Sequence, residues 1–152
     1  MTLFKSRNEN STSKKRVIRT CCEGEVVDIS NSSNTAISMK LFGDGFCVHC
    51  SAPEITSPLG GIVTEVSDNG HTFTIKGHDG VTILVCIDHG SKNEVLETGY
   101  SAGDLIEAGD LLCRKENAEA AVIVTNADKL SKFRIAYGKT RSAEDGVIVY
   151  EL

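Results

Sequence analysis

A histidine and a cysteine stand on two neighbouring segments that the sequence predicts to pair as a β-hairpin. Segments 71–77 and 81–88 are rich in Val, Ile, Thr and Phe, and the stretch 77–80, Gly-His-Asp-Gly, is typical of a tight turn. If its two central residues form the turn, His71 falls directly opposite Cys86, with Cβ atoms about 5 Å apart. An imidazolium beside a thiol lowers the thiol pKa, and the thiolate is a nucleophile. The pair is the first candidate for chemistry; the plainer interpretation is a half-buried histidine and an inert thiol.

The same pairing assigns the two faces of the hairpin. Phe73 and Leu84 border the histidine and the cysteine on one face, because side chains alternate along a strand. Val81, Ile83 and Val85 point to the other face, which is the better candidate for the core. A slip of one residue in the pairing would exchange the faces.

The six cysteines are expected to be reduced thiols, because the first residues contain no apolar segment of a secretory signal. Cys47 and Cys50 form a Cys-x-x-Cys motif within a predicted strand, whereas redox motifs of this kind sit at a helix N-terminus. No second Cys-x-x-Cys completes a zinc site. Cys21, Cys22 and Cys113 are interpreted as small core or strand-end residues. No disulfide is therefore predicted.

Many short strands position these residues. Apolar runs of four to eight residues, broken by Gly, Asp, Asn and Ser, indicate an all-β fold, a compact sandwich or barrel. Residues 36–42 and 125–133 are each expected to hold a short helix, and Asn126 is a plausible cap for the second. Segment 23–30 resembles segment 60–67, which suggests a duplicated β unit. The predicted strands are 16–20, 25–29, 45–50, 61–67, 71–77, 81–88, 111–114, 121–125 and 146–151.

Composition and charge restrict the function. A chain of 152 residues with 40% apolar residues predicts one domain, and no run approaches the roughly 18 apolar residues of a membrane span. Residues 1–19 carry six basic residues and one acidic residue, although the chain as a whole has a net charge of −5. An acidic body argues against nucleic-acid binding. We expect residues 1–15 to be a flexible basic tail and residues 16–152 to be the single domain. Any contact with a membrane would be between the basic tail and an anionic lipid surface.

A set of motifs resembles the glucose-type enzyme IIA of the bacterial phosphoenolpyruvate-dependent sugar phosphotransferase system. The resemblance extends over nearly the whole chain and rests on the set rather than on one motif. It implies a compact β-sandwich with a duplicated hybrid motif. It also implies a cytoplasmic phosphoryl carrier, without a cofactor, that takes phosphate from the phosphocarrier protein HPr and passes it to a IIB domain. The motifs are Gly43-Asp44-Gly45, Thr56–Val63, Gly70–Ile75, Gly80–Val85, Ala102-Gly103-Asp104, Ala108–Leu112 and Val122–Asn126.

The resemblance assigns roles and exposes departures. His71 falls on the stabilising position of the family's histidine pair, and Cys86 falls on the position of the phosphoryl acceptor, normally histidine. Asp88, His89 and Gly90 replace the family's Gly-Ile-Asp, so the acidic position carries Gly90. Asn69 replaces the hydroxyl partner of the stabilising histidine. The matching positions of the family's apolar docking ring are Thr35, Ile37, Ser67, Leu84 and Lys92, of which only Ile37 and Leu84 are clearly apolar.

Three functions remain open from the sequence. The preferred one is a protein related to enzyme IIA whose phosphoryl transfer is reduced or lost and which acts in binding or regulation. The second is an active carrier that uses Cys86 as acceptor, with His71 holding the charge. The third is a zinc site formed by His71 and Cys86, with His89 as a further ligand.

A function of another class, a zinc peptidase of related β architecture, is disfavoured. Such enzymes use a His-x-His pair and a His-x-x-x-Asp, and neither pattern occurs in the chain. A biotinyl or lipoyl carrier would need a lysine at a hairpin tip, but His78 and Asp79 stand at the tip.

Overall fold

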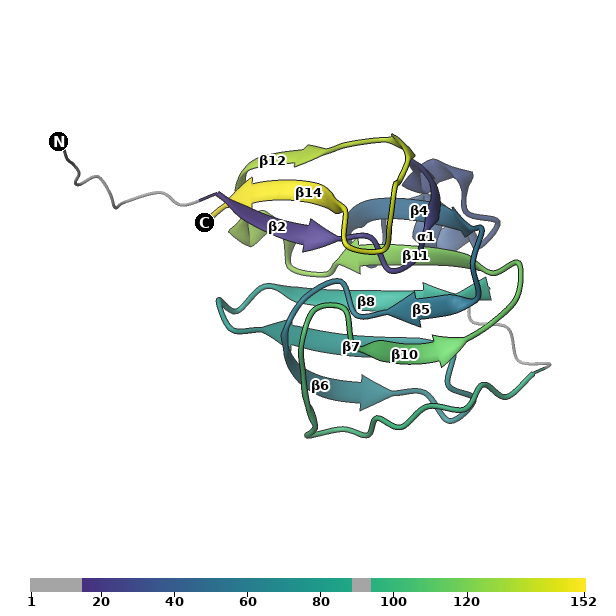
Figure 1. The fold of residues 1–152 in the computed structure, drawn as a ribbon. Helices are drawn as coiled ribbons and strands as arrows, with labels where there is room; N and C mark the ends of the chain where they lie inside the picture. The colour runs from purple at the N-terminus through teal and green to yellow at the C-terminus, as the bar shows by residue number, and fades with distance from the viewer. Residues whose placement is uncertain (1–14, 89–93) are drawn as a thin grey trace, which may run out of the picture.

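The computed structural model describes residues 15–88 and 94–152 and consists almost entirely of antiparallel β-structure (Figure 1). The main sheet has eight strands in the order β13-β3-β4-β11-β8-β7-β6-β9. A three-stranded sheet, β12-β14-β2, and a two-stranded sheet, β10-β5, pack against it. Each strand of the sequence repeat pairs with the strand that follows it, β3 with β4 and β6 with β7. The prediction of an all-β sandwich is confirmed.

All nine predicted strands are present, within two residues at either end. Their observed bounds are β2 Arg16–Arg19, β3 Gly24–Asp28, β4 Asp44–Cys50, β6 Gly61–Val66, β7 Thr72–Gly77, β8 Thr82–Ile87, β10 Leu111–Arg114, β11 Glu119–Val124 and β14 Gly146–Glu151. A further strand, β9 Leu105–Ile106, lies in segment 102–110, whose two Gly-Asp turns predict a short strand between them. Three other short strands of the described residues escaped prediction because they lack the length or the alternation that identifies a strand. They are β5 Glu54–Thr56, β12 Ser131–Ile135 and β13 Gly138–Lys139.

The two predicted helices are shorter than expected. The helix expected over 36–42 is α1, Thr35–Ser38, which follows the 3₁₀ turn η2, Ile29–Asn31, and ends four residues earlier than expected. Lys40 has φ +60°, and the bonds from Leu41 N–H to Ala36 C=O and from Lys40 N–H to Ile37 C=O close a Schellman motif that ends α1.

The predicted helix over 125–133 does not form, apart from a single turn. Only the 3₁₀ turn η4, Ala127–Lys129, forms, and β12 begins at Ser131. Asn126 makes no capping bond. Its side chain instead accepts a hydrogen bond from Thr82 N–H and donates one to Gly80 C=O. Because these contacts with the β7–β8 hairpin use the Asn126 side chain, it does not cap a helix.

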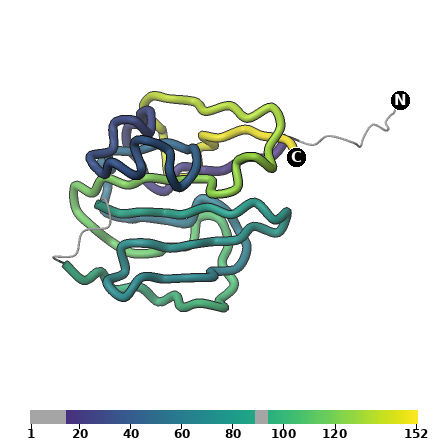
Figure 2. The backbone as a smooth tube through the Cα atoms, turned by 180° about the vertical axis from the view of Figure 1, so that it is seen from behind, coloured from purple at the N-terminus to yellow at the C-terminus, as the bar shows by residue number. Residues whose placement is uncertain are grey.

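The main sheet has apolar residues on both faces. One face packs against the two smaller sheets and forms the principal core, with fully buried Phe73, Ile75, Ile83 and Val85 at its centre. The other face carries a smaller cluster under η2 and α1, which lie together on one side of the molecule (Figure 2). We call this second group the cover cluster; it comprises Ile29, Ile37, Cys47, Cys86, Ala121 and Ile123.

The expectation of six reduced thiols is wrong. Cys22, two residues before β3, and Cys50, the last residue of β4, form a disulfide. The lack of a secretory signal did not reveal this pair, because Cys22 and Cys50 are 28 positions apart and are brought together by the pairing of Gly24 with Cys50. Cys21, Cys47, Cys86 and Cys113 are thiols, and all four are buried. The interpretation of Cys21 and Cys113 as core residues is thus confirmed.

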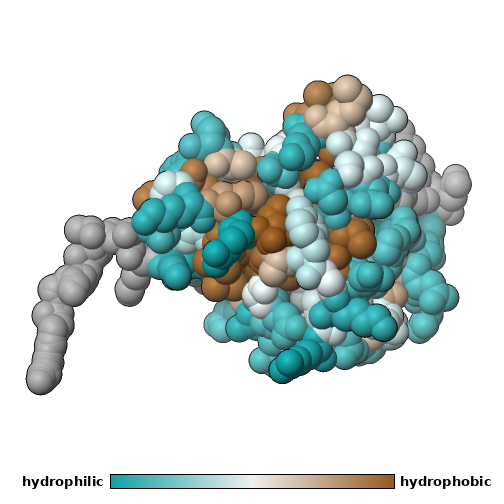
Figure 3. Space-filling view, turned by 90° about the horizontal axis from the view of Figure 1, so that it is seen from above, coloured by the Kyte–Doolittle hydropathy of each residue, from teal (hydrophilic) through white to brown (hydrophobic). Residues whose placement is uncertain are grey.

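The three-stranded sheet contacts the turn of the β7–β8 hairpin. Tyr150 of β14 donates its hydroxyl hydrogen bond to the Asp79 carboxylate over 2.6 Å, and Arg16 of β2 forms an ion pair with the same carboxylate at 3.6 Å. From above this sheet, hydrophobic side chains gather at the centre of the visible face (Figure 3). In the described part of the chain, no helix has the length and apolar character needed to cross a bilayer.

Candidate functional site

The β7–β8 hairpin has a three-residue turn rather than the predicted two-residue turn. Gly77 N–H donates to Val81 C=O, and Gly80, at φ +90°, takes the left-handed position that completes a loop of this length. The Asp79 carboxylate accepts from Val81 N–H and fixes the turn. The extra turn residue shifts the pairing by one position relative to the sequence prediction.

This shift corrects the predicted contacts of the two candidate residues. Thr72, not His71, pairs with Cys86, and Phe73 pairs with Val85 rather than with Leu84. His71 precedes β7 and lies opposite Ile87, whose N–H donates to the His71 carbonyl. The prediction that His71 and Cys86 face each other directly across the hairpin is therefore wrong. They are offset by one position along the ladder, where successive side chains alternate between faces.

The imidazole of His71 is completely buried, and only one of its two ring nitrogens has a hydrogen-bond partner among the described residues. Its Nδ1 lies 3.0 Å from the carbonyl oxygen of Ile87, and its backbone N–H donates to Ser67 Oγ and Asn69 Oδ1. Because a carbonyl can only accept, Nδ1 carries the proton, and the lone pair of the neutral ring is on Nε2. Nε2 is buried and has no hydrogen-bond partner among the described residues. Its lone pair is thus not used by Cys86 or by any other group there.

Cys86 lies in the cover cluster and is 5% exposed. It forms one row across the main sheet with Ala121 of β11 and Cys47 of β4. Burial, with smaller contributions from Cys47 and Asp88, raises the pKa of the Cys86 thiol to about 11. The thiol is therefore almost entirely protonated at neutral pH, which is the inert form of a cysteine.

Asp88 directly follows β8 and has a left-handed conformation, with φ +48°. Its carboxylate accepts from Glu119 N–H and forms an ion pair with Lys115 at 3.2 Å, and Lys115 also pairs with Glu94 at 2.7 Å. Lys115 thus holds the residues on both sides of segment 89–93. His89, Gly90 and Lys92, which the sequence analysis named, lie outside the described residues.

The predicted binding residues separate into three environments. Ile37 belongs to the cover cluster and Leu84 packs against it, so both lie near Cys86, as the sequence predicts for residues around one site. Asn69 contacts the Ser67 hydroxyl and the His71 backbone. Phe73 is fully buried in the principal core. Its prediction as a surface binding residue is therefore wrong, because the register shift moves it to the opposite face.

An apolar surface that the sequence analysis missed follows α1. Met39, Leu41 and Phe42 are 65%, 70% and 48% exposed, beside the segment whose Ile37 covers the Cys86 row. The sequence does contain a sign of this surface, since three of the four residues before Gly43 are large and apolar. They were assigned instead to the predicted helix over 36–42, in which apolar residues were expected to be buried.

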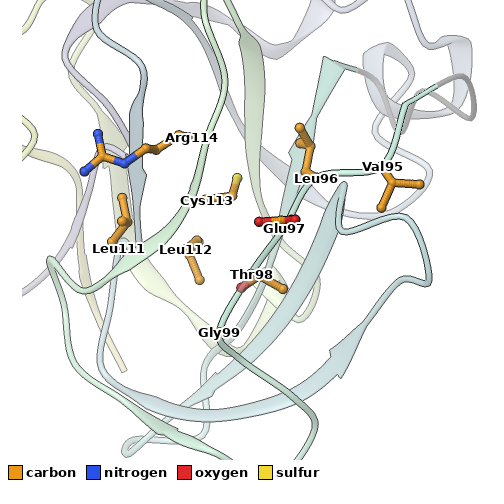
Figure 4. Close-up of a pocket in the computed structure, with 9 residues that line it drawn as sticks. All are labelled: Val95, Leu96, Glu97, Thr98, Gly99, Leu111, Leu112, Cys113 and Arg114. Carbon is orange, nitrogen blue, oxygen red and sulfur yellow. The ribbon is translucent and has the colours of Figure 1, made fainter.

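A groove of about 600 Å³ lies elsewhere (Figure 4). Segment 95–99 and strand β10 face each other across it, and Glu97, Thr98 and Arg114 contribute its polar groups. None of the predicted site residues that the structure describes lines this groove.

Zinc at His71 and Cys86 stays a prediction. Within residues 15–88 and 94–152, no group of three or more His, Cys, Asp and Glu side chains is arranged to hold a metal ion. The third ligand considered from the sequence, His89, is outside those ranges.

Comparison with known proteins identifies the family. The model of the phosphoenolpyruvate-dependent sugar phosphotransferase system, EIIA 1, matches residues 16–130. A glucose-specific EIIA component from Staphylococcus aureus is 29% identical over 134 residues, which is 80% of this chain and 81% of that protein. One from Borreliella burgdorferi is 24% identical over 137 residues, 82% of this chain and 72% of that protein.

A solved structure has the same fold. The glucose permease IIA from Mycoplasma capricolum matches with a TM-score of 0.77 and 19% identity, and the match covers 90% of this chain and 96% of that one. The family match over most of the chain supports the resemblance seen in the sequence. The chain belongs to the EIIA 1 family of the phosphoenolpyruvate-dependent sugar phosphotransferase system.

Proposed function

We propose that the chain is a cytoplasmic EIIA component whose phosphoryl transfer is reduced or lost and which acts by binding other proteins of the sugar phosphotransferase system. The observation that carries this proposal is the state of Cys86, which the resemblance places at the acceptor position. The thiol is buried, and its pKa is raised to about 11. At pH 7 only on the order of one molecule in ten thousand has the thiolate that phosphoryl transfer needs.

The neighbouring histidine does not compensate. The Nδ1 proton of His71 is directed to Ile87 C=O, and Thr72 takes the position opposite Cys86. An unperturbed imidazole, by contrast, is mostly neutral at pH 7 and has a lone pair ready to accept a phosphoryl group. Replacing histidine by a buried thiol therefore removes the nucleophile and leaves the surrounding scaffold in place.

The expected partners are HPr and a IIB domain, because the chain belongs to the EIIA 1 family. The exposed side chains of Met39, Leu41 and Phe42 support binding at this face, because apolar residues gathered in one exposed segment are typical of protein contact sites. They adjoin α1, which covers the row containing Cys86. A partner that approaches Cys86 from the α1 side would meet them.

Incubation with phosphoenolpyruvate, enzyme I and HPr, followed by intact-mass measurement, tests the proposal. We expect little or no mass gain for the natural chain and a gain of one phosphoryl group for Cys86→His. Cys47→His is the matched control, since it places a histidine on the same face two strands further across the sheet, and it should gain none. Phosphorylation of natural Cys86 at a rate ordinary for the family would replace this proposal with the active cysteine carrier. Acid and base stability then distinguish phosphocysteine from phosphohistidine.

A further inference from the structure

The Cys22–Cys50 disulfide encloses a specific part of the fold. The two cysteines are 28 positions apart, and the interval 22–50 contains β3, η2, α1 and β4. This interval, which we call the cover segment, supplies Ile29, Ile37 and Cys47 to the cover cluster. It also carries the exposed apolar residues after α1. The disulfide therefore closes the loop that covers one face of the main sheet.

Few other interactions hold the outer part of the cover segment. On its outer side β3 pairs only with the two residues of β13, Gly138 and Lys139. The helix α1 has four residues and is too short to be stable without tertiary contacts. β3 pairs with β4 over all five of its residues, so its attachment to the rest of the main sheet runs through β4, which pairs with β11 over six residues. A covalent bond between the two ends of the segment thus restrains opening of the part between them.

The disulfide coexists with thiols in the same molecule. Cys21, adjacent to Cys22, is a buried thiol, as are Cys47, Cys86 and Cys113. Structural disulfide frameworks are typical of oxidising compartments, whereas disulfides in the cytoplasm are usually transient or redox-sensing. The cytoplasmic location proposed above therefore makes a reversible bond the expected type, and this step rests on the proposed function.

We propose that Cys22 and Cys50 form a redox-sensitive tether, which in its oxidised form holds the cover segment on the main sheet and in its reduced form releases it to open locally. The oxidant is a low-molecular-weight disulfide such as glutathione disulfide. Cys50 is 7% exposed and Cys22 is fully buried, so Cys50 reacts first during local opening. Its thiolate attacks one glutathione sulfur and releases one glutathione thiolate.

The Cys22 thiolate then attacks the Cys50 sulfur of the mixed disulfide and releases the second glutathione. The two protein thiols lose two electrons and two protons in total, and these appear in two glutathione thiols. Reduction is the reverse reaction with two glutathione molecules.

The first measurement counts thiols in the full chain. The protein is equilibrated in buffers with defined ratios of glutathione to glutathione disulfide, denatured, alkylated and weighed. We expect four alkylated cysteines in the oxidised form and six in the reduced form, with one peptide linking residues 22 and 50. Six alkylated cysteines at every ratio, or a disulfide between a different pair, would overturn the proposal.

The second measurement is hydrogen exchange of the two forms. Reduction should accelerate exchange in residues 29–38 at least tenfold and leave the β7–β8 hairpin unchanged, and the melting temperature should fall by about 5–10 °C. The double variant Cys22→Ala/Cys50→Ala should behave as the reduced form does at every ratio. The double variant Cys21→Ala/Cys113→Ala is the matched control and should keep the response.

Equal exchange of residues 29–38 in the two forms would contradict the tether even if the disulfide forms. The natural chain alone provides this comparison, so the result stands if either variant fails to fold. Both measurements are independent of phosphorylation. Failure of the proposed function would appear in the intact-mass assay instead.

Discussion

The imidazole of His71 replaces a backbone group in the ladder between β7 and β8. Its Nδ1 lies 3.0 Å from Ile87 C=O, while its own backbone N–H is directed to Ser67 and Asn69. The side chain thus satisfies a buried carbonyl at the end of the hairpin. This contact also leaves the Nε2 lone pair without a partner among the described residues.

The first prediction tests whether His71 has this structural role. His71→Ala removes the donor to Ile87 C=O and leaves a cavity, and it should lower the free energy of unfolding by about 2–4 kcal/mol. His71→Asn keeps a donor near the position of Nδ1 and should lose at least about 1 kcal/mol less. Urea unfolding of both variants measures the difference. Equal losses would show that the hydrogen bond contributes nothing beyond the volume of the ring.

The second prediction concerns alkaline pH. Burial raises the pKa of the thiols of Cys47, Cys86 and Cys113 to about 11 from a usual value of 9.0. The unfolded chain therefore loses these protons at lower pH than the folded chain does. The stability that the buried thiols contribute is complete below pH 9 and is lost as the pH rises towards 11.

Urea unfolding at intervals between pH 8 and pH 10.5 checks this dependence. We expect the free energy of unfolding to decline over this range, and Cys86→Ala should decline less steeply than the natural chain. Alkylation of folded Cys86 by iodoacetamide should still be rising in rate at pH 10. A rate that reaches its plateau near pH 8.5 would show an ordinary, accessible thiol.

The third prediction concerns Asn126, which joins η4 to the hairpin. Its side chain accepts from Thr82 N–H at 2.9 Å and donates to Gly80 C=O at 2.9 Å. Asn126→Ala loses both bonds and should destabilise the protein by about 1–3 kcal/mol. Asn126→Asp keeps the acceptor and loses the donor, so its melting temperature should lie between those of Asn126→Ala and the natural chain. A melting temperature unchanged in Asn126→Ala would exclude this role.

The fourth prediction tests the apolar surface after α1. Leu41→Ser should weaken binding of HPr at least several-fold without a change in melting temperature, because Leu41 is 70% exposed. Val95 is 75% exposed and lies in the groove away from α1, so Val95→Ser is a matched control that should leave binding unchanged. Calorimetric titration with HPr gives both affinities. Equal affinities of the two variants would place the partner elsewhere.

The fifth prediction concerns the basic N-terminal residues. Residues 1–14 lie outside the described structure, and their composition offers few apolar side chains to bury. Their deletion should change the melting temperature by less than about 4 °C, which corresponds to about 1 kcal/mol for a domain of this size. Thermal unfolding followed by circular dichroism is sufficient. A larger fall would show that the segment is docked on the domain.

The sequence by itself determined the fold class and most of the strands. Segments such as 61–66 and 82–87 combine β-branched residues with flanking glycines, and these local signals do not depend on the rest of the chain. The sequence also identified His71 and Cys86 by their types. Short elements such as β5 and β13 were missed, because strands of two or three residues are formed by their partners rather than by their own composition.

Tertiary structure decided the arrangement of the site. A two-residue and a three-residue turn are both compatible with Gly-His-Asp-Gly. Contacts of Asp79 with Arg16 of β2 and Tyr150 of β14 act on the turn from strands that are distant in the sequence. The three-residue turn shifts every pair between β7 and β8 by one residue, so Thr72 and not His71 lies opposite Cys86. The Cys22–Cys50 bond has the same origin. Local sequence carries no information on which residues 28 positions apart will meet, because that depends on the register of strands that pair only in the folded chain.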